Sequence, residues 1–299
     1  MLSVGSREPP PVPAGWAPRG RSARMPDVGL DGTGGGAAAR APRGQWSRPG
    51  PPPRPGHHRG GVPGGGAPAA RRYDVLALDL PGQGRSPALP PTVWPGVEAL
   101  TDAVEQELDR QAVPAPHVLG VSLGGRLGLE LARRKRARSV VAIAPTGPLT
   151  PPERAFQTAS LAAARLGFST LAPVADPLLR SAVRRTAALA LLRARGWRTP
   201  AGEAAALVRG FAEAEDFWRL VRHAILPEAT LDYRAIDCPV VVAQGTHDVL
   251  TLSQAAWLTL LVPGARFRVL PFAGHSSVGD VPRHVIGLVD DVAAAADCS

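Results

Sequence analysis

The sequence predicts an α/β fold in which a mainly parallel sheet carries an inserted helical cap. From residue 73 onward, short apolar runs alternate with amphipathic segments of helical spacing. Strands that alternate with helices form mainly parallel sheets with right-handed crossovers. An Ala-, Leu- and Arg-rich stretch at residues 151–233 interrupts this alternation with helical spacing and several breakers, which predicts a group of short cap helices. The 299 residues, 44% of them hydrophobic, suffice for one core and a cap.

Residues 1–72 form a leader of different composition. They contain 14 Pro and 16 Gly and show neither an alternating nor a 3.6-residue apolar pattern. We therefore expect this Gly/Pro/Arg-rich leader to be disordered. Its 11 Arg and 3 acidic residues carry +8 of the chain's net charge of +9. The remaining residues are nearly neutral, so we expect no nucleic-acid-binding surface on the folded part.

The composition changes within a few residues of Arg72, and a folded domain at 73–299 is expected to follow. One hypothesis is a frame-shifted or mis-started leader in a GC-rich gene. The other is a genuine basic extension that binds an acidic partner. Translating the two other frames upstream of codon 72 separates these hypotheses. If the frame has slipped, one of those two frames should encode apolar strands.

The first folded elements are a strand and a helix. Residues 74–80 are a short apolar run closed by Pro81-Gly82, as expected of a buried parallel strand. Residues 97–111 place Leu100, Val104 and Leu108 on one stripe of a helix. The later segments repeat this alternation, with strands over 117–121, 139–144, 239–243 and 266–270 and helices over 123–134, 253–261 and 281–295.

Composition also indicates where the protein works. No window approaches the roughly 18 consecutive apolar residues of a membrane-spanning helix, and the first residues lack the apolar stretch of a secretory signal. The two cysteines, Cys238 and Cys298, fit a reducing compartment, because a chain of this length needs no disulfide. We expect a cytoplasmic protein without membrane attachment.

Ser122 is the candidate nucleophile. Gly120-Val121-Ser122-Leu123-Gly124 matches G-x-S-x-G, a pattern that alone is weak in a chain with 33 Gly. Its position strengthens it, because it falls between an apolar strand and a helix, where a sharp turn lifts the serine hydroxyl above the sheet edge. The alternative is a glycine-rich turn with an ordinary serine.

A serine nucleophile needs a histidine base and a carboxylate that fixes the histidine tautomer. His275 follows the last predicted strand, and Asp248 follows the strand before it. Both would hang over the carboxyl edge of the sheet, and the order Ser, Asp, His is typical of one class of hydrolase. Cap acids such as Asp176 and Asp216 would have to reach in from above.

Four segments together resemble the α/β-hydrolase family over residues 73–295. They are the D-x-P-G-x-G-x-S turn at 79–86, the elbow at 120–125, Gly245-Thr246-His247-Asp248, and Gly274-His275. The resemblance implies the catalytic triad of Ser122, Asp248 and His275, with the backbone N–H of Leu123 as one oxyanion donor. It also implies a cap that shapes the pocket, and neither a metal nor an organic cofactor.

The sequence departs from the family's pattern before residue 73. The early strands and the His-Gly loop that supplies a second oxyanion N–H are not visible, and His58-Arg59-Gly60-Gly61 is only a faint echo of that loop. The sequence therefore leaves two candidate functions open. One is a serine hydrolase that cleaves a small ester, thioester or related acyl compound through an acyl-serine intermediate. The other is a catalytically impaired binding protein, or damaged gene product, that lacks part of the oxyanion hole.

The expected partner is a small acyl substrate that is neutral and apolar at its acyl side. The cap supplies apolar side chains in quantity, and Phe211, Phe217 and Trp218 are candidates for the pocket wall. The alternative for these three aromatic residues is packing inside the cap. Serine at the elbow argues against dehalogenases and epoxide hydrolases, which resemble the family but place Asp there.

Overall fold

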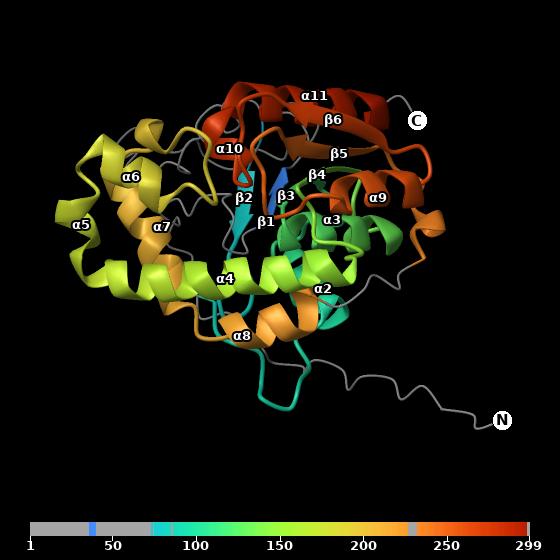
Figure 1. Cartoon of the computed structure of the whole chain (residues 1–299). Helices are drawn as coiled ribbons and strands as arrows, with labels where there is room; N and C mark the ends of the chain where they lie inside the picture. The colour runs from blue at the N-terminus through green and yellow to red at the C-terminus, as the bar shows by residue number, and fades with distance from the viewer. Residues whose placement is uncertain (1–35, 40–72, 74, 85, 227–231, 298–299) are drawn as a thin grey trace, which may run out of the picture.

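A six-stranded sheet in the order β2-β1-β3-β4-β5-β6 forms the centre of the fold (Figure 1). The computed structural model describes residues 36–39, 73, 75–84, 86–226 and 232–297. Its strands are β1 (Gly36–Ala39), β2 (Val75–Leu78), β3 (His117–Val121), β4 (Ser139–Ile143), β5 (Val240–Gly245) and β6 (Arg266–Leu270). The strands β3 to β6 pair in parallel, which confirms the predicted mainly parallel sheet.

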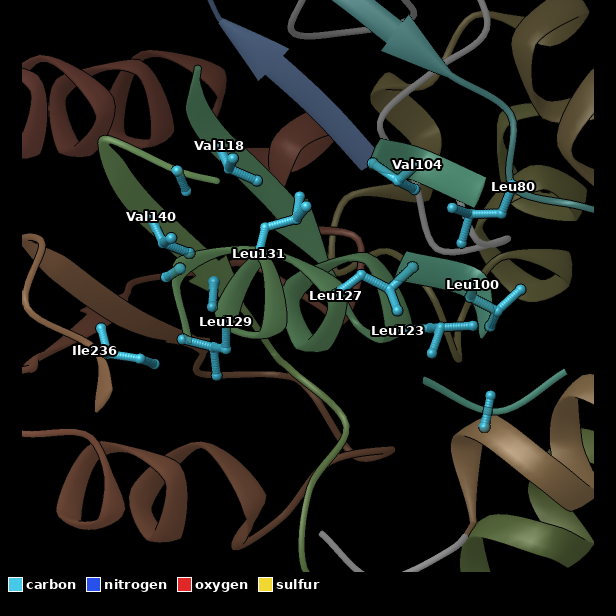
Figure 2. Packing of buried hydrophobic residues seen from close by; sticks show 14 of the residues in the cluster. Leu80, Leu100, Val104, Val118, Leu123, Leu127, Leu129, Leu131, Val140 and Ile236 are labelled. Carbon is cyan, nitrogen blue, oxygen red and sulfur yellow. The ribbon is translucent and has the colours of Figure 1, made fainter. Parts of the chain in front are cut away.

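Helices cover both faces of this sheet. Alternate residues of a strand point to opposite faces, and the two hydrophobic clusters divide accordingly. Val118, Val140 and Val242 pack with α2 (Val97–Arg110), α3 (Leu123–Arg133) and α9 (Gln254–Leu261). Leu119, Val141 and Val241 pack with α10 (Ser277–Asp280) and α11 (Pro282–Asp297). Figure 2 shows the first face, where Leu127 of α3 lies between the strands and α2.

The strand β1 differs from the prediction. It lies between β2 and β3 and is antiparallel to both. Its sequence, Gly-Ala-Ala-Ala, has no β-branched or aromatic residue and no alternation, so the sequence predicts no strand there. Main-chain pairing on both sides defines the strand instead. Apart from these four residues, the predicted disordered leader at 1–72 lies outside the described residues.

The predicted cap region is helical. It contains α4 (Pro151–Leu171), η1 (Ala172–Val174), α5 (Ala175–Leu178), α6 (Ala182–Ala188), η2 (Gly196–Arg198), α7 (Ala201–Glu213), α8 (Phe217–Leu220), η3 (Val221–Ile225) and η4 (Tyr233–Ala235). The first of these begins with a capping box, in which Thr150 and Glu153 bond each other's backbone or side chain, and with two prolines. Figure 1 shows α4 running across the front of the molecule, with α5, α6 and α7 beside it.

The cap has a hydrophobic core of its own and is fixed to the loop that follows β6. Its core includes Phe168, Leu189 and Phe211. The Asp280 carboxylate accepts three backbone hydrogen bonds, from Gly274 in that loop at 2.8 Å and from Ala194 and Arg195 of the cap at 2.8 and 3.0 Å. One buried carboxylate therefore joins the cap to the loop after β6. In the described ranges, no helix is both long and apolar enough to span a membrane.

Candidate active site

Ser122 occupies a sharp turn between β3 and α3. Its backbone has φ 55° and ψ −119°, a conformation that non-glycine residues rarely adopt. The backbone is held from both sides, because its N–H donates to the carbonyl of Ile143 at 2.8 Å and its carbonyl accepts from Arg126 and Thr146 at 3.1 and 3.2 Å. The structure thus places Ser122 at the end of a central strand, as the sequence predicts.

Gly120 allows this turn to close. A Cβ atom at Gly120 would lie 2.2 Å from the carbonyl oxygen of Gly124, a distance that real side chains do not show. Any other residue would push the start of α3 away from the end of β3. The glycine two positions before the serine is therefore a steric requirement of the turn.

His275 and Asp248 lie on neighbouring loops, after β6 and β5. The Nδ1 atom of His275 lies 3.0 Å from Oδ2 of Asp248, and both residues are buried. An ionised carboxylate only accepts hydrogen bonds, so the ring nitrogen that faces it carries the proton. This tautomer leaves Nε2 of His275 as the acceptor, which is the atom that a general base uses.

Asp248 is held as a carboxylate by several donors. Oδ1 accepts from the backbone of Leu250 at 2.8 Å and of Thr251 at 3.3 Å, while Oδ2 accepts from the Thr251 hydroxyl at 2.6 Å and Gln244 Nε2 at 2.8 Å. Burial alone raises the pKa of Asp248. The charge and hydrogen bond of His275, with the hydrogen bonds from the Thr251 hydroxyl and the Leu250 backbone, outweigh burial, and the pKa lies below its ordinary value.

The lowered pKa of Asp248 predicts a pH dependence of stability. A carboxyl group with a depressed folded-state pKa stabilises the fold above its unfolded pKa of about 3.9, and this contribution disappears as pH falls through the folded value. Asp248→Asn lacks the titrating group. The difference in unfolding free energy between wild type and Asp248→Asn should be largest near neutral pH and shrink below about pH 4. Urea unfolding at a series of pH values measures it, and a difference that stays constant down to pH 3 would contradict the assignment.

One pocket joins Ser122, Leu123 and His275. It encloses about 780 Å³, including the solvent at its mouth. The remaining wall is mostly apolar and comes largely from the cap: Gln83, Gln157, Ser160, Leu161, Ala164, Leu191, Leu192, Phe211, Ala214, Phe217, Leu220, Ile225 and Leu250. Phe211 and Phe217 thus line the pocket, whereas Trp218 lies outside its lining and is 51% exposed.

The cap acids take no part in this pocket. Asp176 forms an ion pair with Arg209 at 2.9 Å on the exposed side of the cap. Asp216 forms one with Arg219 at 3.0 Å. Asp248, rather than either of these two cap acids, pairs with His275.

Two groups could stabilise an oxyanion beside Ser122. The N–H of Leu123 belongs to the first turn of α3, where N–H groups have no acceptor within the helix. The sequence shows no clear loop for a second oxyanion N–H, and residues 58–61, which resemble that loop only weakly, lie outside the described residues. Gln83 is the residue that sequence reasoning missed: it lines the pocket, is 8% exposed, and in the described ranges its side-chain amide makes no hydrogen bond. The turn motif at 79–86 contains Gln83, but nothing in that motif marks it as an oxyanion donor.

The comparisons with known proteins agree on the fold. A model described as the alpha/beta hydrolase family matches residues 55–286. Epoxide hydrolase EphH of Mycobacterium tuberculosis is 31% identical over 199 residues, which cover 64% of this chain and 91% of that protein. A pimeloyl-[acyl-carrier protein] methyl ester esterase of Chromobacterium violaceum is 29% identical over 216 residues, 69% of this chain and 78% of the esterase.

A solved structure extends this similarity. MGS-M2, an alpha/beta hydrolase from a Medee basin deep-sea metagenome library, superposes with a TM-score of 0.55 at 16% identity, over 74% of this chain and 79% of that one. At this identity the likeness concerns the fold. Within the described part of the chain, no three His, Cys, Asp or Glu side chains are grouped so that they could hold a metal ion.

Proposed function

Because the chain belongs to the alpha/beta hydrolase family, we propose that it is a serine hydrolase that cleaves a small ester, thioester or related acyl compound. One observation carries the proposal. Ser122, at a strained turn, shares a pocket with His275, whose Nδ1 is bonded to the Asp248 carboxylate. A nucleophile, a base and an orienting acid are the parts that acyl transfer to serine requires.

In the proposed first step, Ser122 Oγ attacks the carbonyl carbon while His275 Nε2 takes the hydroxyl proton. The carbonyl electron pair moves to oxygen, and the N–H of Leu123 stabilises this oxyanion. Collapse of the tetrahedral species breaks the bond to the alcohol or thiol, which receives the proton from His275. Asp248 stabilises the imidazolium throughout. The product is an acyl-Ser122 ester.

The second step releases the acid. His275 Nε2 takes a proton from water, and the water oxygen attacks the acyl carbon as hydroxide. The bond to Ser122 Oγ then breaks, and Oγ regains a proton from His275. The apolar wall formed by residues such as Leu161, Leu191 and Phe211 supports an acyl group that is neutral and mostly apolar.

Gln83 is proposed as the second oxyanion donor, because it brings a side-chain amide without a hydrogen-bond partner to the pocket that contains Ser122 and Leu123. Gln83→Met keeps a similar volume but removes the donor. We expect kcat to fall about 10²-fold with little change in KM, since the hydrogen bond forms mainly in the transition state. Steady-state kinetics with p-nitrophenyl butyrate checks this. An unchanged kcat, with thermal unfolding also unchanged, would exclude the role.

The activity for which the epoxide hydrolase relative is named is not proposed for this chain. Nucleophilic attack of a serine hydroxyl on an epoxide carbon would leave an ether, which water does not cleave under mild conditions. A carboxylate nucleophile leaves an ester, which water does cleave. Serine at position 122 therefore favours acyl substrates. The esterase relative is named for an acyl substrate, which supports the same choice.

A fluorophosphonate probe tests the proposal. An activated Ser122 should form a covalent adduct, found by mass spectrometry on the peptide that contains it, and Ser122→Ala should remain unlabelled. A protein that binds acyl compounds without turnover is the alternative, and it follows if the oxyanion hole is incomplete. Intact protein that the probe does not label would favour this alternative.

A further inference from the structure

One face of the cap helix α4 is turned to the pocket. The pocket-lining residues of this helix are Gln157, Ser160, Leu161 and Ala164, spaced three, four and seven residues from the first. This spacing places them on one side of an α-helix. The face is polar at its beginning and apolar further along. An apolar pocket thus contains a local pair of hydrogen-bonding side chains.

Gln157 is held in a single orientation. It is 3% exposed, and its Nε2 atom donates to the carbonyl oxygen of Leu250 at 3.0 Å. A carbonyl only accepts hydrogen bonds, so the amide nitrogen has to face Leu250, and the amide cannot be reversed. The opposite atom, Oε1, is therefore an acceptor that is buried and has no partner. A buried acceptor without a donor is unfavourable.

Ser160 lies one turn further along the same face. Its side chain is half-buried, and in the described part of the chain its hydroxyl bonds no other side chain or carbonyl. A hydroxyl can both donate and accept. Together with Gln157 Oε1, this side of the pocket offers one acceptor and one donor.

We propose that Gln157 and Ser160 form a subsite for a hydroxyl group on the substrate's acyl chain. The substrate hydroxyl donates to Gln157 Oε1 and accepts from Ser160 Oγ. An N–H group could only donate, so it would leave the serine unpaired. The proposal rests on the proposed function, and it narrows the substrate class from apolar acyl compounds to hydroxyacyl esters or thioesters.

The position of the subsite relative to the triad follows from Leu250. The carbonyl of this residue holds Gln157, and its N–H donates to Asp248 at 2.8 Å. The subsite is thus attached to the loop that carries the catalytic acid. We expect the substrate hydroxyl on a carbon close to the scissile carbonyl, C2 or C3 of the acyl chain.

The test compares matched esters. For wild type, kcat/KM is measured with p-nitrophenyl esters of hexanoate, 2-hydroxyhexanoate and 3-hydroxyhexanoate. One hydroxyester should exceed hexanoate at least tenfold, since a site built to bond a hydroxyl discriminates against the analogue without it. Gln157→Leu should reduce this ratio to about one. If Gln157 had only a structural role, Gln157→Leu would lower kcat/KM for all three esters alike and leave the ratio unchanged. That result would overturn the proposal.

Further variants keep the test decisive. Ser160→Ala should also reduce the ratio of the hydroxyester to hexanoate. This variant replaces Gln157→Leu in the test if Gln157→Leu does not fold. Ser169→Ala, on the exposed side of the same helix, should leave the ratio and the rates at wild-type values. Equal kcat/KM values for the three esters in wild type would overturn the subsite.

Binding separates this inference from the proposed reaction. The Ser122→Ala protein should hold the esters without turnover, and calorimetric titration should show the same tenfold preference for a hydroxyester. If the Ser122→Ala protein prefers a hydroxyester but wild type hydrolyses none of the esters, the proposed function is wrong and the subsite is supported. If wild type hydrolyses the esters but neither experiment shows a preference, the subsite is wrong and the proposed function is supported. Failure of Ser122→Ala to bind any of the esters counts against the subsite.

Discussion

Ser122→Ala should abolish the hydrolysis of short p-nitrophenyl esters, with kcat lowered by about 10⁴ to 10⁶. The substitution removes the only atom that forms the covalent bond in the proposed mechanism. The backbone contacts of residue 122, to Ile143, Arg126 and Thr146, do not involve the side chain and should persist. Steady-state kinetics measures the loss, and circular dichroism with thermal unfolding shows whether the fold remains.

Ser169→Ala is the matched control for this experiment, because it makes the same chemical change on an exposed helix surface. It should leave kcat and KM unchanged. If Ser122→Ala retained most of the activity while folded, Ser122 would have no place in the mechanism, and the elbow would be an ordinary turn.

Asp248→Asn should lower kcat by about 10⁴ while KM changes little. An amide in place of the carboxylate can present an N–H to Nδ1 of His275, which favours the wrong tautomer and removes the stabilisation of the imidazolium. The loss is expected although the pair at 3.0 Å could keep its geometry. Kinetics over pH 6 to 9 measures it.

The cap acids provide the controls for Asp248. Asp176→Asn breaks an ion pair with Arg209 on the cap surface, and Asp216→Asn breaks one with Arg219. Neither carboxylate bonds His275, so both variants should keep near wild-type kcat. If either cap variant lost its activity and Asp248→Asn kept most of it, the assignment of the acid would be wrong.

The central strands could be predicted from the sequence because each is a short, continuous apolar run. Residues 117–121, 139–143 and 240–243 point alternately to two helical layers, so almost every position is buried and the run has sharp ends. The strand at 36–39 could not be predicted, since alanine and glycine carry no strand pattern. Its place in the sheet depends on partners that come later in the chain.

The same distinction applies to the site. Ser122, Asp248 and His275 each follow a predicted strand directly, so local sequence indicates their position at the sheet edge. Gln83 reaches the pocket from the turn after β2, whereas Gln157 reaches it from the cap helix α4. Their roles depend on tertiary placement, and nothing within a few residues of either one signals it. Polar side chains in a turn and on a helix are ordinarily solvated.

The carboxylate of Asp280 makes the cap part of the catalytic domain rather than an exchangeable module. It bonds Ala194 and Arg195 of the cap and also Gly274, the residue before His275. In addition, the N–H of Ser276 donates to the carbonyl of Leu192 at 2.8 Å. A chimera that received a foreign cap would lose these acceptors and donors unless 192–195 were retained. Recombination that aims to change substrate range would therefore also disturb the loop that positions the general base.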